Sequence, residues 1–275
     1  MLIKEEPLKH WIDNFYGYGS WQARTWFVAY EEGGGDLPEE VAEKLNFFYR
    51  EHRTTTGGLC NIRELYGHVG FRFDGPKANL YSNFFEYRFG KDAIQHGVWK
   101  NLIAFDHGYR GQGVPDLLSY QKESFASPSN RNEALIRLYP LPSPHGHAWF
   151  YSWLDLPRFP FLKSRALYEQ QVYQTRIQKI LNNINVYKPE VVLMYGMNNI
   201  NALKQSVAEL FPTAKFKMVK AIKQFLPQHH RAELNGTIML ITTQIPALRH
   251  NRIETGFNWE EFGKVVKAET KSLQR

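Results

Sequence analysis

Cysteine is nearly absent from this chain of 275 residues, in which Cys60 is the only one. A single thiol excludes a disulfide framework and any cluster that needs several thiolates, and it fits a reducing compartment. Long apolar runs are missing too: no stretch approaches the roughly 20 apolar residues of a membrane span. The N-terminus is charged from Lys4 onward and has no apolar run of signal-peptide length. We therefore expect a cytoplasmic protein with no membrane partner.

Motifs for metals and phosphate loops are also lacking. His145 with His147 and His229 with His230 have no second cluster at the spacing of metal ligands. The glycines at 33–35 are not followed by the lysine and Ser/Thr of a phosphate loop. The sequence therefore predicts no bound metal and no other cofactor.

Positive charge and aromatic rings, in contrast, are plentiful. The chain has 34 Lys and Arg against 27 Asp and Glu, which gives a net charge of +7 and a pI near 9.3. This surplus favours an anionic partner, with nucleic acid first, although many basic proteins bind none. A hydrophobic content of 43% and an aromatic content of 15% are enough for a large core and exclude disorder. The rings suit either that core or stacking against bases.

Apolar runs alternate with amphipathic segments along most of the chain. The expected strands are 25–30, 134–139, 191–195, 237–242 and a short one at 216–219, and the expected helices are 37–53, 164–187 and 198–210. This alternation predicts an α/β fold of three layers, α/β/α, with a mostly parallel central sheet. We expect a single domain over 1–275, with a lead-in helix in the first 24 residues. An insertion at about 54–130 carries a short helix at 98–105.

Chemistry in such folds lies beyond the carboxyl ends of the strands. Three turns in this sequence occupy such places, namely Tyr30–Gly35, Pro140–Pro144 and Thr243–His250. The glycines of the first turn let backbone N–H groups approach a phosphate or a base closely. Glu31 and Glu32 pass directly from a buried strand into that glycine turn, which makes them the candidate catalytic acids. The other interpretation is a pair of acids that face solvent or a helix dipole.

Three segments in order carry a family resemblance, each after an apolar strand: Ala29-Tyr-Glu-Glu-Gly-Gly-Gly35, Leu135-Ile-Arg-Leu-Tyr-Pro-Leu-Pro-Ser-Pro144 and Ile245-Pro-Ala247. Together they resemble the motifs of the uracil-DNA glycosylase superfamily, most closely a divergent bacterial branch whose first motif reads Tyr-Glu-Glu-Gly-Gly-Gly. The resemblance covers residues 20–50 and 130–250 and leaves out 54–130. It implies a uracil-DNA-glycosylase-like fold and a base-flipping DNA repair glycosylase without a cofactor or an obligate protein partner.

The resemblance also assigns roles to single residues. Glu31 falls where the family places the group that orients or activates the attacking water, and Glu32 replaces the family's proline and could share that duty. Arg137 stands where a residue, often asparagine, contacts the base edge. Ile245 and Pro246 occupy the His-Pro positions of the third motif, so the histidine that bonds the departing base is missing.

The remaining predicted contacts surround these positions. The base pocket would include Tyr30, Gly33, Gly34 and an aromatic platform, for which the candidates are Phe47, Phe48, Phe84 and Phe85. Each of these phenylalanines has a plain alternative as a core residue. Beside the flipped nucleotide, wedge and DNA contacts would come from Ser143, Pro246, Leu248, Arg249 and His250. Their alternative is an ordinary surface loop.

Breaking an N-glycosidic bond builds positive charge on the sugar and negative charge on the leaving base. Glu31 can stabilise the first and activate water, as carboxylates do in sugar hydrolysis, once the base has left the stack. Arg137 in place of asparagine and the lost histidine argue against plain uracil. We therefore expect a modified base, such as a bulky cytosine derivative of phage DNA, and a role in phage defence. Alternatively, Arg137 pairs with Glu31 or Glu32 as a buried ion pair.

Two further alternatives stay open. The chain could be a non-catalytic DNA-binding sensor of altered bases. It could also hydrolyse the N-glycosidic bond of small nucleosides, a reaction that needs neither a wedge nor a basic groove.

Overall fold

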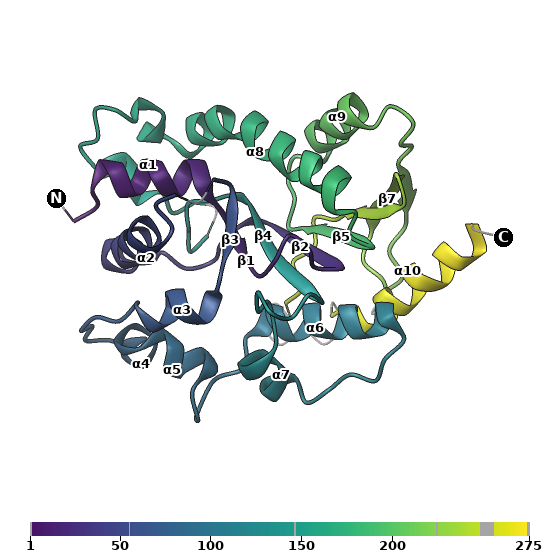
Figure 1. Ribbon diagram of the computed structural model, residues 1–275, viewed down its shortest axis with the longest axis horizontal. Helices are drawn as coiled ribbons and strands as arrows, with labels where there is room; N and C mark the ends of the chain where they lie inside the picture. The colour runs from purple at the N-terminus through teal and green to yellow at the C-terminus, as the bar shows by residue number, and fades with distance from the viewer. Residues whose placement is uncertain (1, 55, 146, 224, 248–255, 274–275) are drawn as a thin grey trace.

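A computed structural model describes residues 2–54, 56–145, 147–223, 225–247 and 256–273 (Figure 1). Residues 270–273 are described by their backbone only. In these residues one sheet of eight strands runs through the molecule in the order β3-β1-β4-β2-β5-β8-β7-β6. The strands are β1 (Phe15–Tyr18), β2 (Thr25–Glu31), β3 (Gly58–Cys60), β4 (Glu133–Tyr139), β5 (Val191–Tyr195), β6 (Lys217–Val219), β7 (His229–Leu234) and β8 (Thr237–Ile241).

The four central strands β4, β2, β5 and β8 are parallel. Thr25 of β2 lies opposite Glu133 on one side and Val191 on the other, and Val191 in turn lies opposite Ile238 of β8. Their apolar runs are buried almost without a break, as parallel strands covered on both faces require. Because the four strands run in one direction, their carboxyl ends form one edge of the sheet.

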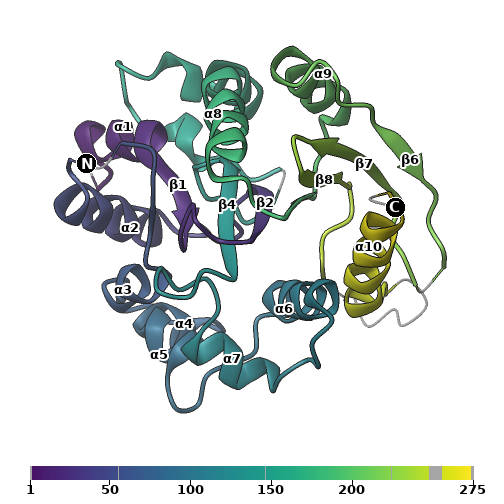
Figure 2. The ribbon, with the colours of Figure 1, turned by 45° about the vertical axis from the view of Figure 1, so that its right-hand side comes forward.

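Helices cover both faces of the sheet, so the molecule has three layers, α/β/α. Figures 1 and 2 show α8 and α9 on one face and α6 with α10 on the other. The helices of the described chain are α1 (Glu5–Asn14), α2 (Pro38–Glu51), α3 (Ile62–Gly67), α4 (Ala78–Ser82), α5 (Phe84–Phe89), α6 (Gly97–Arg110), α7 (Leu117–Glu123), α8 (Arg165–Tyr187), α9 (Ile200–Leu210) and α10 (Trp259–Leu273), and two 3-10 turns are Phe150–Trp153 and Pro160–Lys163.

Local chemistry explains where the long helices begin, end and touch. The Ser164 hydroxyl accepts a hydrogen bond of 3.2 Å from the Leu167 N–H at the start of α8, as capping residues do. On the other face of the sheet, α6 and α10 pack closely because a glycine of α6 faces the backbone of α10. A Cβ on Gly108 of α6 would lie 2.1 Å from the carbonyl oxygen of Glu260, so only glycine permits this contact.

The predicted fold class is confirmed, and four local predictions need correction. The lead-in helix ends at Asn14, because Phe15–Tyr18 forms strand β1, antiparallel to β4. The expected helix at 98–105 is the first part of the longer α6, which continues to Arg110. Strand β7 and helix α10 were not predicted. Segment 54–130 supplies the edge strand β3 and helices α3–α7, so it takes part in the sheet itself.

A buried acid lies at the opposite, amino-terminal end of β4. Glu133 accepts hydrogen bonds from the Ala126 N–H (3.3 Å) and the Tyr120 hydroxyl (3.2 Å). Burial, reinforced by the negative charge of Asp106, raises the pKa of Glu133 from 4.5 to about 8. Between these two values the folded chain holds a proton that the unfolded chain has released. The free energy of unfolding therefore falls as pH rises through this window.

Replacing Glu133 with glutamine should remove this loss. We expect the melting temperature of Glu133→Gln to exceed that of the wild type at pH 8.5 by several degrees, at about 2–4 °C per kcal/mol. The difference should shrink toward pH 5. Thermal unfolding followed by circular dichroism across this range measures it, with Glu43→Gln, an exposed site on α2, as the control. Parallel pH profiles of wild type and Glu133→Gln would contradict the assignment.

Candidate active site

The turns that follow β2 and β4 lie in contact at the carboxyl edge of the sheet. The Ser143 N–H donates a hydrogen bond of 3.1 Å to the carbonyl oxygen of Glu32. Gly35, at a φ of +71°, lies so close to the second turn that a Cβ there would be 3.0 Å from the carbonyl oxygen of Pro142. Two of the three turns predicted from the sequence are therefore joined directly.

The third predicted turn lies at the same edge, two strands away. The Gly196 N–H, just after β5, donates to the carbonyl oxygen of Gln244 (3.1 Å), and the Asn101 side chain of α6 donates to that of Pro246 (2.9 Å). Ile245 is 43% exposed and its side chain lies beside Gly196, whereas Pro246 is buried. The predicted DNA contacts Leu248, Arg249 and His250 fall outside the described residues.

Glu31 is the outer of the two adjacent acids. Its side chain is 18% exposed and forms an ion pair with Arg165 in the first turn of α8. The same guanidinium donates to the Ser143 hydroxyl and to the carbonyl oxygen of Ala148 (3.1 Å), so it links the first turn to the second. Burial raises the pKa of Glu31, and the Arg165 charge only partly opposes it. Glu31 is thus an oriented carboxylate that still reaches solvent.

Glu32 points the other way and is 3% exposed. Its carboxylate accepts hydrogen bonds from the Tyr18 hydroxyl at 3.0 and 2.9 Å and from the Lys44 ammonium at 3.0 Å. Burial tends to raise the pKa of Glu32, but Lys44 and Arg137 outweigh it and hold the pKa below the ordinary value. Glu32 is therefore a buried anion held by Tyr18 and Lys44.

Lys44 of α2 connects Glu32 to the glycine turn. It also contacts Glu40 at 2.7 Å, and Glu40 accepts a hydrogen bond of 2.8 Å from the Gly35 N–H. Gly34 has a φ of +109°, and a Cβ there would lie 2.9 Å from the Glu40 carboxylate. The chain of contacts from Glu32 through Lys44 and Glu40 thus fixes the conformation of the turn.

Arg137 lies at the carboxyl end of β4 in a row that crosses three strands. Ala29 of β2 is opposite Arg137 on one side and Tyr195 of β5 on the other. The guanidinium lies 5.7 Å from the centre of the Tyr18 ring. Its charge and a hydrogen bond to Tyr195 oppose the burial that raises the pKa of that tyrosine.

The hydrogen-bonding capacity of Arg137 is incompletely used. It donates to the carbonyl oxygen of Ile136 (3.2 Å), while its Nε has no partner in the described part of the chain. Among those residues no carboxylate oxygen comes within 4.0 Å of the guanidinium. The alternative interpretation, a direct ion pair of Arg137 with Glu31 or Glu32, is therefore wrong, because those carboxylates pair with Arg165 and Lys44.

The other predicted pocket residues differ in their placement. Tyr30 is half-buried, with its ring 4.7 Å from that of Tyr139. Gly33 is exposed, and nothing lies within 4 Å of a Cβ placed there. Phe47 is buried, and its ring packs 4.4 Å from that of His68.

Core packing therefore replaces the predicted base-stacking role of Phe47. Phe48 and Phe84 are buried as well, and Phe85 is half-buried.

Sequence reasoning missed the residues that distinguish the two glutamates. The burial of Lys44 could have been predicted, because it shares the helical spacing of one buried face with Val41, Leu45 and Phe48. A charge on such a face needs a buried partner. The role of Arg165 could not have been predicted, since an arginine in the first turn of a helix does not by itself indicate a partner.

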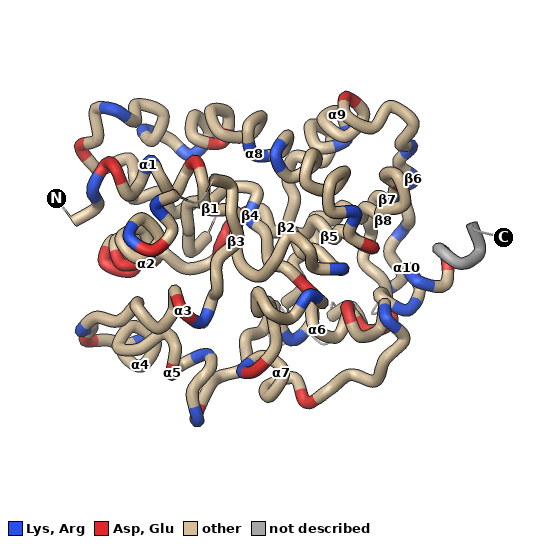
Figure 3. The backbone as a smooth tube through the Cα atoms, in the orientation of Figure 1, with Lys and Arg blue, Asp and Glu red and all other residues tan. Residues whose placement is uncertain are grey.

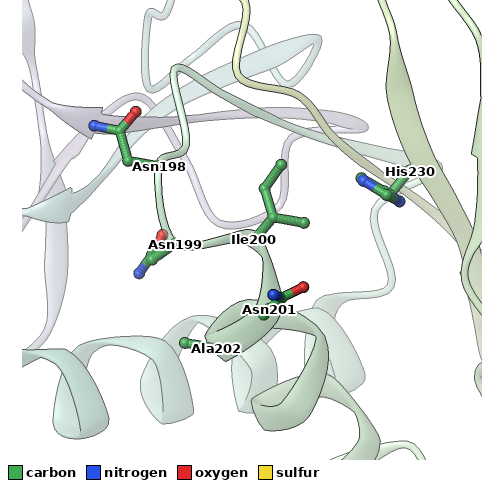
Figure 4. Close-up of a pocket in the computed structure, with 6 residues that line it drawn as sticks. All are labelled: Asn198, Asn199, Ile200, Asn201, Ala202 and His230. Atoms are coloured by element: carbon green, nitrogen blue, oxygen red, sulfur yellow. The ribbon is translucent and has the colours of Figure 1, made fainter.

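An open hollow of about 300 Å³ lies at the start of α9, just beyond β5 (Figure 4). It is lined by Asn198, Asn199, Ile200, Asn201, Ala202 and His230. Its wall contains none of the predicted catalytic or pocket residues. The hollow is therefore a feature separate from the two glutamates.

No protein-family model matches the chain, and no curated protein matches it either. Within the described ranges, no three His, Cys, Asp or Glu side chains are grouped to hold a metal ion. No helix of that same part of the chain has the length and apolarity to cross a membrane.

Proposed function

We propose that the chain is a DNA glycosylase that hydrolyses the N-glycosidic bond of a flipped-out, modified base. The observation that carries the proposal is the presence of two unlike groups at the ends of neighbouring strands. Glu31, a carboxylate that reaches solvent, ends β2, and Arg137, an incompletely bonded guanidinium, lies near the end of β4. The resemblance of the three strand-end segments to the uracil-DNA glycosylase motifs supports the same function.

The chemistry assigns a different task to each group. Glu31 activates the attacking water and stabilises the positive charge that develops on the sugar. Arg137 faces the opposite demand, because negative charge develops on the leaving base. A fixed cation in a water-poor site stabilises such charge strongly. In this scheme Arg137 compensates for the histidine that is missing at Ile245.

Arg137 also limits which bases the site can accept. A guanidinium is a hydrogen-bond donor only, so it selects acceptor atoms on the base or on its substituent. Plain uracil needs a donor and an acceptor at one edge, which asparagine supplies and arginine does not. We therefore infer a base that carries extra acceptors, such as a substituted cytosine of phage DNA, and a role in anti-phage defence.

Incubation with a panel of DNAs tests the function. Each DNA carries one modified base, and abasic sites are scored by strand cleavage in alkali. Cleavage of one modified DNA by the wild type and by Glu43→Gln, but not by Glu31→Gln, supports the proposal. Binding without abasic sites would favour a non-catalytic sensor. In such a sensor the Glu31–Arg165 ion pair would have a structural role only. Base release from free nucleosides alone would favour a small-molecule hydrolase.

Arg137→Gln should change selectivity more than DNA binding. Loss of a good bidentate contact is worth about 1–3 kcal/mol. We expect a fall of about 5- to 150-fold in the single-turnover rate on the preferred base, and a smaller fall on other bases. The exposed Arg131→Gln is the matched control, and thermal unfolding shows whether the variant is folded. Equal losses on every base would contradict a role in selectivity.

A further inference from the structure

One stretch of the chain carries several positive charges and no negative charge. Residues 210–232 contain no Asp or Glu, but include Lys215, Lys217, Lys220, Lys223 and Arg231. These are five positive charges against none, whereas the whole chain has a net charge of +7. Residues 210–232 are therefore a run of positive charge without any acid.

The four lysines of this stretch lie along the outer edge of the sheet. β6 pairs with β7 alone in the described sheet and forms its last strand. Lys215, Lys217, Lys220 and Lys223 are all exposed, and none forms an ion pair with a described residue. Figure 3 shows Lys and Arg positions following one another along this edge. We call these four residues the β6 lysine strip.

The strip leads toward the edge that carries the candidate active site. β6 and β8 are both antiparallel to β7, so β6 ends at the same edge as the central strands. Met218 lies opposite His230, which lines the hollow at the start of α9. Lys204 of α9 lies 5.8 Å from the centre of the Phe216 ring and adds a further cation between strip and hollow.

Protection of an edge strand explains only part of this arrangement. Exposed lysines on an edge strand discourage pairing with a second chain. That reasoning covers Lys217, which lies within β6, but Lys215, Lys220 and Lys223 lie outside the strand. The strip also exposes Met218 and Ile222, at 54% and 53%, which a purely protective edge does not need.

We propose that the β6 lysine strip binds the sugar-phosphate backbone of DNA that flanks the reacting nucleotide. The identification of the polyanion as DNA rests on the proposed function. Unpaired, exposed lysines in a row suit phosphates, and such contacts position the nucleic acid without reading its sequence. The side chains of Met218 and Ile222 add apolar contact to the sugars.

Salt-dependent binding to unmodified duplex DNA, followed by fluorescence anisotropy, tests the strip. The test variant is K215Q/K217Q/K220Q/K223Q. The matched control removes four exposed charges elsewhere, in K4Q/R53Q/K91Q/K179Q. Each lost phosphate contact should reduce the slope of log K against log salt by about 0.9. We expect a slope smaller by about 2–4 and at least tenfold weaker binding at about 0.1 M salt, with little change in the control.

Several outcomes would overturn the proposal. A slope equal to that of the wild type would do so, and so would an equal loss in the control variant. Self-association of the test variant with unchanged DNA binding would show that the lysines only protect the edge. Binding to vesicles of anionic lipid but not to DNA would assign the strip to a membrane surface.

Failure of the strip and failure of the glycosylase proposal give different results. If the strip is right, the single-turnover rate on modified DNA at saturating protein stays within about threefold of the wild type, because the lysines do not touch Glu31. Base release with an unchanged salt slope rejects the strip alone. A reduced slope without base release from any DNA rejects the glycosylase alone.

Discussion

Glu31→Gln should release the target base about 10²- to 10⁴-fold more slowly than the wild type, the range attributed to a general base. The amide cannot take a proton from water or balance the charge on the sugar, although it is nearly the same size. The measurement is a single-turnover time course of abasic-site formation at saturating protein. Binding to the same DNA should change little, because the loss concerns the transition state.

The pH dependence gives this prediction a second signature. Glu31 has to be ionised to act, and burial raises its pKa above 4.5. The wild-type rate should therefore fall on acidification at a pH above the ordinary range of glutamate, and Glu31→Gln should lack this limb. Glu43→Gln should keep both the rate and the limb. A rate for Glu31→Gln within about threefold of the wild type would remove Glu31 from the mechanism.

Lys44→Met should produce the largest loss of stability, about 3–5 kcal/mol at pH 7.5. Lys44 is 1% exposed and contacts both Glu32 and Glu40. Methionine keeps most of the volume but leaves two buried carboxylates without their cation, which is the costly way to break a buried ion pair. Chemical unfolding should show this loss, and the melting temperature should fall by about 6–20 °C.

Acid should diminish the difference between Lys44→Met and the wild type. Lys44 helps to hold the pKa of Glu32 below 4.5, so this contribution is present above that pH and is lost as pH falls through the lowered value. In the variant the Glu32 carboxylate can protonate, which relieves its repulsion with the neighbouring Glu40 carboxylate. Lys91→Met, at an exposed site, is the control. A loss under about 1 kcal/mol at pH 7.5 would show that the cluster is not a structural element.

The layers and the central strands were predictable because apolar runs alternate with amphipathic segments along the sequence. Short apolar runs bounded by turn residues, such as 191–195, are typical of strands buried on both faces, and the helices between them have clear ends, such as Ser164 before α8. Strand β1 was hidden because four residues after a helix give too short a pattern. Strand β7 was hidden by its polar residues, His229 and His230 among them, at the outer part of the sheet.

The site was predictable in position but not in detail. The turn with Glu31 and Glu32 could be located, since ligands bind beyond strand ends. Which glutamate faces solvent depends on Lys44 and Arg165, and Arg165 is 134 residues away from Glu31. The environment of Arg137 depends likewise on Tyr195, from another strand. Contacts between distant segments decide these roles, and a single sequence does not record them.

The charge of the chain also shows which properties can be predicted from the sequence and which need the structure. The net value of +7 pointed to an anionic partner, but said nothing about where it binds. The absence of acids from 210–232 was visible in the sequence. Its meaning became apparent only when β6 was placed at the outer edge of the sheet, with its lysines exposed and unpaired in the described structure.

The most direct test of the central claim is the analysis of small molecules released from DNA that carries a modified base. The account predicts free modified base in amounts equal to the abasic sites formed, with strands that break only after alkali. It also predicts that Glu31→Gln releases almost none at equal protein concentration. Strand breaks without free base, or release at the wild-type rate by Glu31→Gln, would contradict it.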